Sequence, residues 1–108
     1  MIVEPTGGNV RLLFLGGASE VGASCLVVEA AGRRVLVDAG IRMHGDDPLP
    51  DLSRLQDLGG IDAVVVTHAH ADHIGALPLA VGAFPLATVI ATPATAGLMA
   101  VMLEDAIR

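Results

Sequence analysis

Three of the four histidines in the chain lie within seven residues, from Thr67 to His73, and an aspartate lies among them. Imidazole and carboxylate groups are the usual protein ligands of zinc and related metal ions. Such polar groups cost free energy when they are buried without partners, so core packing does not explain them. The alternative is a solvated polar loop. The candidate metal ligands are His68, His70, Asp72 and His73.

The spacing of these residues predicts two metal positions. His68 and His70 are two residues apart, so in an extended segment their side chains point the same way. Asp72 and His73 follow where the chain turns toward a helix predicted from Ile74. The stretch also comes directly after the apolar residues 64–66, at the carboxyl end of a predicted strand, where α/β proteins place their sites. Two ligands at each of two neighbouring points predict a paired-metal site.

The rest of the chain alternates between predicted strands and helices. We predict strands over residues 10–15, 24–29, 34–38, 61–66 and 88–91, the second and third of them forming a hairpin. We predict helices over residues 51–58, with Asp51 as N-cap, over 75–83, and from Pro93, with Thr92 as cap. Leu98, Val101 and Met102 are predicted to form the core-facing side of the last helix.

Asp38 ends the third predicted strand and precedes Ala39 and Gly40. Its carboxylate either caps a turn or supports the histidine-rich loop by accepting a hydrogen bond from a ligand histidine. Cys25 is the only cysteine, so the chain forms no internal disulfide, which fits a reducing compartment. Because Cys25 lies in an apolar run, we interpret it as a buried, inert thiol.

The composition describes an apolar and acidic chain. Of its 108 residues 53% are hydrophobic and only 2% aromatic, which is typical of an α/β protein whose sheet is buried on both faces. The net charge of −6 gives this segment no electrostatic footprint for nucleic acid. The glycine-rich residues 16–22 lack the spacing of a phosphate-binding loop and are interpreted as a tight connection.

No secretory signal is expected, because the first residues lack a basic start and an apolar core. Residues 74–103 carry no charge, but Pro78, Pro85 and Pro93 interrupt them. Proline breaks helices, so we expect no membrane span. With no secretory signal and no disulfide, the expected location is the cytoplasm.

The stretch from Thr67 to His73 resembles the HxHxDH signature of the metallo-β-lactamase superfamily. Residues 16–25 resemble the glycine-rich opening of its β-CASP nucleases, the group that contains ribonuclease J and the mRNA 3′-end cleavage endonucleases. Residues 36–40 resemble the first superfamily motif, whose aspartate is Asp38 here. Residues 74–78 and 92–95 resemble the segments that follow in this group, so the resemblance covers most of the chain.

The resemblance implies an α/β fold, the N-terminal αβ half of an αββα sandwich. Residues 1–108 would form this partial domain, with no second domain. The part of the sequence after His73 contains no histidine and a single aspartate, Asp105. The later metal ligands of the family and its inserted β-CASP domain are therefore not matched.

The function implied by the resemblance is hydrolysis of RNA phosphodiester bonds at a dinuclear zinc site. His68 and His70 would bind one zinc ion, and Asp72 and His73 the other, with Asp72 also holding or deprotonating the nucleophile. The 108 residues alone are expected to be inactive, and to self-associate as a homo-oligomer. Two alternatives remain: a hydrolase of thioesters, lactones or β-lactams, and a non-catalytic partner subunit of a nuclease complex. The sequence does not separate endonuclease from exonuclease action.

Overall fold

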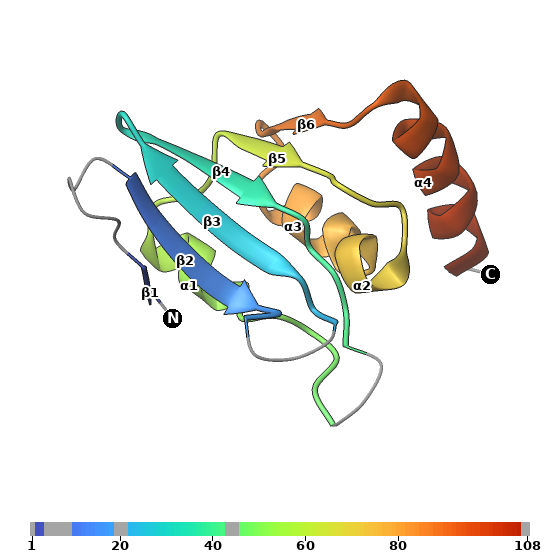
Figure 1. Cartoon of the computed structure of the whole chain (residues 1–108), viewed down its shortest axis with the longest axis horizontal. Helices are drawn as coiled ribbons and strands as arrows, with labels where there is room; N and C mark the ends of the chain where they lie inside the picture. Colours follow the sequence, from blue (N-terminus) through green and yellow to red (C-terminus); the bar gives the residue numbers. More distant parts are fainter. Residues whose placement is uncertain (1, 4–9, 19–21, 43–45, 107–108) are drawn as a thin grey trace.

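The computed structural model describes residues 2–3, 10–18, 22–42 and 46–106. Its strands form one six-stranded sheet in the order β1 to β6, and α1, α2 and α3 lie on one face of that sheet (Figure 1). The strands are β1 (Ile2–Val3), β2 (Val10–Gly16), β3 (Cys25–Ala30), β4 (Arg33–Val37), β5 (Ala63–Val65) and β6 (Thr88–Ile90). The helices are α1 (Ser53–Asp57), α2 (Ala71–Ile74), α3 (Leu77–Ala83) and α4 (Pro93–Ala106).

The sheet is antiparallel at its beginning and parallel at its end. Strands β1 to β4 pair antiparallel, and β3 and β4 form the predicted hairpin through Ala31 and Gly32. Both turn residues have positive φ, 52° and 75°, as a tight hairpin requires. Strands β4, β5 and β6 pair in parallel because helices connect them. The predicted strands and the α/β class are therefore confirmed.

The hydrophobic core lies between the sheet and the helices α1, α2 and α3. Alternate residues of the strands point into it, as the period of two requires. From the sheet these are Leu13, Leu15, Cys25, Val27, Leu36 and Val64, and from the helices Leu55, Ile74, Leu77 and Ala80. The core thus holds β5 and α2, which flank the histidine-rich loop.

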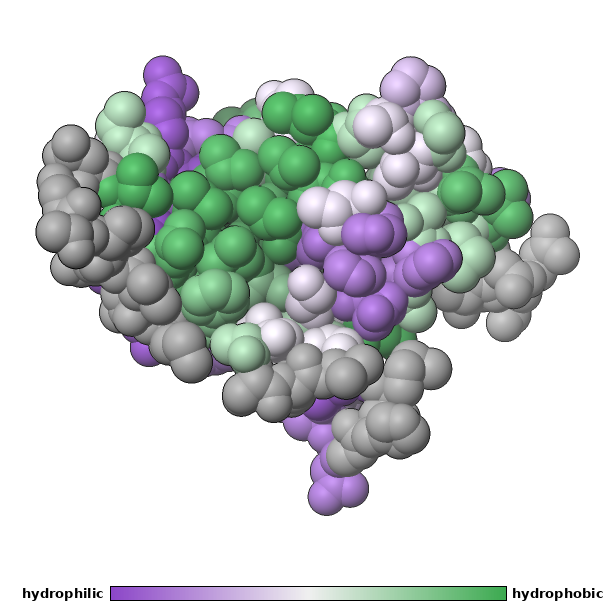
Figure 2. Space-filling view, in the orientation of Figure 1, coloured by the Kyte–Doolittle hydropathy of each residue, from purple (hydrophilic) through white to green (hydrophobic). Residues whose placement is uncertain are grey.

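The other face of the sheet is open in the described part of the chain. Two cross-strand rows lie on it, Leu12–Val28–Val35 and Phe14–Leu26–Val37, and all six side chains are only half-buried. Figure 2 shows them as a continuous hydrophobic surface over β2 to β4. The expectation of a sheet buried on both faces is wrong here, because no described helix crosses this side. We call this surface the open face.

Two local predictions need correction. Helix α1 has Leu52 as its N-cap, without a side-chain hydrogen bond, and Asp51 accepts its hydrogen bond from the Ser53 hydroxyl instead. In α4 the predicted core side is exposed: Leu98 by 59%, Val101 by 64% and Met102 by 40%. Met99 and Leu103 pack against the core instead. The apolar residues of α4 surround the helix, so periodicity did not identify its inner side.

The remaining helix predictions are confirmed. The backbone N–H of Thr95 donates to the hydroxyl of Thr92, which caps α4, and Pro78 lies in the first turn of α3. Residues 19–21 of the glycine-rich stretch lie outside the described residues. Among the helices that the structure describes, none combines the length and the apolar composition of a membrane crossing.

Candidate metal centre

The histidine-rich loop leaves the carboxyl end of β5, which lies between β4 and β6 in the sheet. The buried Val66 follows the strand, residues 67–70 form the loop, and α2 begins at Ala71. Asp72 and His73 therefore lie on a short helix, where a loop was predicted. The parallel neighbour β4 ends at Val37 on the same edge, which brings Asp38 next to the loop.

The backbone after β4 runs alongside α2 and is hydrogen-bonded to it at several points. The N–H of Ala39 donates to the carbonyl of His73 at 2.9 Å, and that of Ile41 to the carbonyl of Ala71 at 3.0 Å. Gly40 lies between them, where a side-chain Cβ would overlap the carbonyl group of Asp72. The backbones are in direct contact, so the position of the loop depends on residues 38–41.

Asp38 is hydrogen-bonded to both Thr67 and His73, and we call it the hub of the site. Its carboxylate is 3% exposed and accepts three hydrogen bonds, two from Thr67 in the loop and one from His73 on α2. Oδ1 accepts from the backbone N–H of Thr67 at 2.8 Å, while Oδ2 lies 2.6 Å from the Thr67 hydroxyl and 2.8 Å from Nδ1 of His73. The φ of Asp38 is +64°, in the left-handed region that aspartate and asparagine tolerate. Of the two sequence interpretations, this geometry corresponds to support of the loop.

The four candidate ligands lie together at this edge. The ring centroids of His68 and His73 are 4.7 Å apart, and those of His68 and His70 are 6.3 Å apart. Nε2 of His73 lies 3.6 Å from Oδ2 of Asp72, so these two side chains face one point. No group of three or more such side chains in the described residues is arranged to hold a metal ion.

Three imidazoles and a carboxylate are suitable ligands for a divalent metal ion, and the sequence predicts that they act as two pairs. A carboxylate that receives Nδ1–H of an imidazole leaves Nε2 free to bind a metal, which is a common arrangement around zinc. His73 and Asp38 have that relation, at 2.8 Å. Full zinc sites use three or four protein ligands. The described residues supply fewer than three ligands to either predicted metal position.

Two contributors to the site were not identified from the sequence. The hydroxyl of Thr67 bridges Asp38 and a histidine, and Gly40 allows the close approach to Asp72. Each stands close to a candidate residue in the sequence, Thr67 directly before His68 and Gly40 two residues after Asp38. Adjacency was the only signal available for either.

The thiol of Cys25 lies in the core below the site and is 1% exposed. Burial, and secondarily the negative charge of Asp38, raises the pKa of Cys25 from 9.0 to about 12. The thiol is therefore protonated throughout the neutral range, in agreement with the expected inert role.

We expect the folded chain to lose stability between pH 9 and about pH 12 because of this single thiol. The unfolded state releases the thiol proton near pH 9 and the folded state near pH 12. The stabilisation is therefore complete below pH 9 and is lost progressively as the pH rises to about 12. The slope would be about 1.4 kcal/mol per pH unit. The chain contains neither lysine nor tyrosine to titrate in that window. Urea unfolding of the Cys25→Ala variant should show a much flatter profile, and equal slopes would contradict the assignment.

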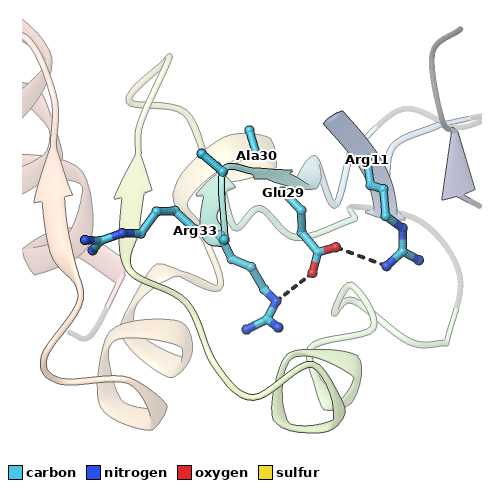
Figure 3. Close-up of a pocket in the computed structure, with 7 residues that line it drawn as sticks. Arg11, Glu29, Ala30 and Arg33 are labelled. Atoms are coloured by element: carbon cyan, nitrogen blue, oxygen red, sulfur yellow. Dashed lines mark hydrogen bonds and ion pairs between the residues drawn. The ribbon is translucent and has the colours of Figure 1, made fainter. Parts of the chain in front are cut away.

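A separate pocket lies at the opposite end of the sheet, around the β3–β4 hairpin (Figure 3). Its central Glu29 pairs with Arg11 at 3.0 Å and with Arg34 at 2.6 Å. The three residues stand in one cross-strand row. Ion pairs that are this exposed add little stability. The pocket contains none of the candidate ligands, because β4 begins there and ends at the histidine-rich loop.

The sequence is similar to curated ribonucleases and transcription termination factors. It is 42% identical over 99 residues to ribonuclease J of Mycolicibacterium smegmatis, a match that covers 85% of this chain and 18% of that protein. It is 48% identical over 75 residues to the transcription termination factor FttA of Methanocaldococcus jannaschii, covering 64% of this chain and 11% of that protein. The chain thus spans less than a fifth of the length of either relative.

The fold has solved counterparts. A B3 metallo-beta-lactamase with an active-site glutamic acid superposes with a TM-score of 0.59 at 24% identity, over 88% of this chain and 34% of that one. The fold is therefore the predicted one, and this chain corresponds to part of it. The sequence model of the metallo-beta-lactamase superfamily matches residues 18–103. Since that match includes the histidine-rich loop and most of the sheet, the chain belongs to the metallo-beta-lactamase superfamily.

Proposed function

We propose that this chain is the N-terminal half, residues 1–108, of the catalytic domain of a ribonuclease. The observation that carries the proposal is the cluster of His68, His70, Asp72 and His73 around the Asp38 hub. The similarity to ribonuclease J supports RNA as the substrate class. The open face supports a partial domain, since a hydrophobic sheet surface is normally covered.

The proposed cofactor is a pair of zinc ions. His68 and His70 would hold one ion, and Asp72 and His73 the other. When bound, two such cations supply Lewis acidity, which lowers the pKa of water and neutralises negative charge on a phosphodiester. Asp72 is the proposed proton acceptor, because Oδ2 faces the same point as His73 Nε2 and its side chain is 39% exposed. Asp38 holds His73 in place throughout.

We expect the isolated chain to bind zinc weakly and to cleave RNA at no measurable rate, because each ion finds only two of its usual three or four ligands. Calorimetric titration with zinc should show binding that the double variant His68→Ala, His70→Ala reduces at least about tenfold. The exposed Asp57→Asn on α1 is the matched control and should bind as the unchanged chain does. Appreciable metal-dependent RNA cleavage by the 108 residues would contradict this expectation.

A protein that contains this chain together with the missing ligands should hydrolyse RNA. Asp72→Ala in that protein should reduce the rate by about 10³, the typical contribution of a proton-transferring side chain.

Parallel assays on thioester, lactone and β-lactam substrates separate the other hydrolases of the superfamily. Little bound zinc, together with no activity on any of these substrates, would indicate a non-catalytic partner subunit. Mapping the RNA products distinguishes cuts within the RNA from removal of its ends. The proposal places this protein in the cytoplasm with RNA as its partner, away from membranes.

The isolated chain is expected to form homo-oligomers through the open face. Val28 lies at the centre of one row, between Leu12 and Val35. Val28→Lys places a charge there, which is costly to bury without a partner. Light scattering after gel filtration should show a shift from oligomer to monomer. Leu98→Lys, on the exposed side of α4, is the control and should leave the mass unchanged. A strictly monomeric unchanged chain at all concentrations would contradict the expectation.

A further inference from the structure

The hydroxyl of Thr67 lies between the buried carboxylate and a candidate ligand. Its Oγ1 is 2.6 Å from Oδ2 of Asp38 and 3.0 Å from Nδ1 of His68. Nδ1 of His73 is further away, at 3.4 Å, and has its own shorter contact with Asp38. Thr67 therefore connects His68 to the same carboxylate that His73 reaches directly.

The donors and acceptors of this cluster determine where the protons lie. A carboxylate can only accept, so the hydroxyl proton of Thr67 is directed at Asp38. Oγ1 then has only lone pairs to offer, and Nδ1 of His68 must carry a proton to bond with it. The same reasoning places a proton on Nδ1 of His73, which lies 2.8 Å from the carboxylate. In a neutral imidazole with a protonated Nδ1, Nε2 carries a free lone pair.

We propose that Thr67 is a positioning residue that holds His68 in the Nδ1–H tautomer, with Nε2 available to bind a metal. Asp38 would then orient one histidine of each predicted metal pair, His73 directly and His68 through Thr67. The metal part of this proposal rests on the proposed function, whereas the tautomer is a property of the metal-free chain. His68 and His73 are close enough, with centroids 4.7 Å apart, for one hub to orient both.

A purely structural role of Thr67 predicts something different. Its backbone N–H also donates to Asp38, at 2.8 Å, and that bond anchors the loop whatever the side chain is. Thr67→Val keeps this anchor and the shape of the side chain and removes only the hydroxyl. Thr67→Ser removes the methyl group and keeps the hydroxyl. The pair of variants separates tautomer control from loop anchoring.

The test is the tautomeric state of each histidine in the metal-free chain, measured by long-range ¹H–¹⁵N correlation. We expect Nδ1–H for His68 and His73 in the unchanged chain and in Thr67→Ser. In Thr67→Val we expect His68 to shift toward Nε2–H while His73 keeps its state. An Nε2–H tautomer of His68 in the unchanged chain overturns the proposal, even when the valine variant does not fold. A folded valine variant with unaltered His68 overturns it as well.

Zinc titration of the same proteins gives a second readout. Loss of a supporting hydrogen bond typically lowers metal affinity 10- to 100-fold, which we expect for Thr67→Val, with recovery in Thr67→Ser. A tautomer shift in a chain that binds no zinc at all counts against the proposed function and supports the assignment of Thr67. Equal zinc affinity of the valine variant and the unchanged chain overturns the link between Thr67 and metal binding.

Discussion

Replacing Gly40 with alanine is expected to displace α2 or to unfold the chain. The added methyl group would overlap the carbonyl group of Asp72 and come within 2.7 Å of the backbone nitrogen of His73. Both obstacles are backbone atoms, which cannot rotate away as a side chain can. We expect a loss of unfolding free energy of more than about 4 kcal/mol, in the range of exceptional substitutions. Chemical denaturation followed by circular dichroism measures it.

Gly97 provides the matched control for this substitution. It lies inside α4, and a Cβ there would meet no atom within 4 Å. Gly97→Ala should stabilise the chain by about 0.5–1 kcal/mol, because alanine has the higher helix propensity. If Gly40→Ala were as well tolerated as Gly97→Ala, the close contact between residues 38–41 and α2 would be wrong. Zinc affinity should follow the same contrast, since Gly40 supports the ligand-bearing helix.

Asp38→Ala is expected to be the second severe substitution. It removes a buried carboxylate that accepts three hydrogen bonds, two of them from Thr67 and one from His73. Bonds to charged groups contribute about 1.5–3 kcal/mol each, and they are not additive. Alanine in the left-handed region costs roughly 1–2 kcal/mol in addition. Together these effects predict a loss of at least about 4 kcal/mol in urea unfolding, with zinc binding abolished. A loss below about 1 kcal/mol would contradict the central role of Asp38.

Asp38→Asn separates folding from ligand orientation. Asparagine tolerates the φ of +64°, and its carbonyl can still accept from Thr67. Its amide, however, presents N–H toward His73, so Nδ1 of that ring must accept and its proton moves to Nε2. We expect a folded protein with zinc affinity reduced about 10- to 100-fold. Unchanged affinity would show that the charge of Asp38 does not govern His73.

Much of the local structure could be predicted because it depends on neighbours in sequence. The apolar run over residues 10–15 and the valines before Thr67 predicted strands, and Thr92 with Pro93 predicted the start of α4. The prediction failed where local pattern is ambiguous. Helix α4 is apolar all round, so its buried side depends on what packs against it. Asp51 and Ser53 bond to each other, and the cap moved to Leu52.

The sequence by itself determined which groups could bind a metal, because His68, His70, Asp72 and His73 are close along the chain whatever the fold. Only the tertiary structure decided how they are held. Asp38 is 29 residues from Thr67 and 35 from His73, and parallel pairing of β4 with β5 brings them together. The contact between Gly40 and Asp72 arises in the same way. Such relations depend on packing between distant segments, which no local pattern of residues encodes.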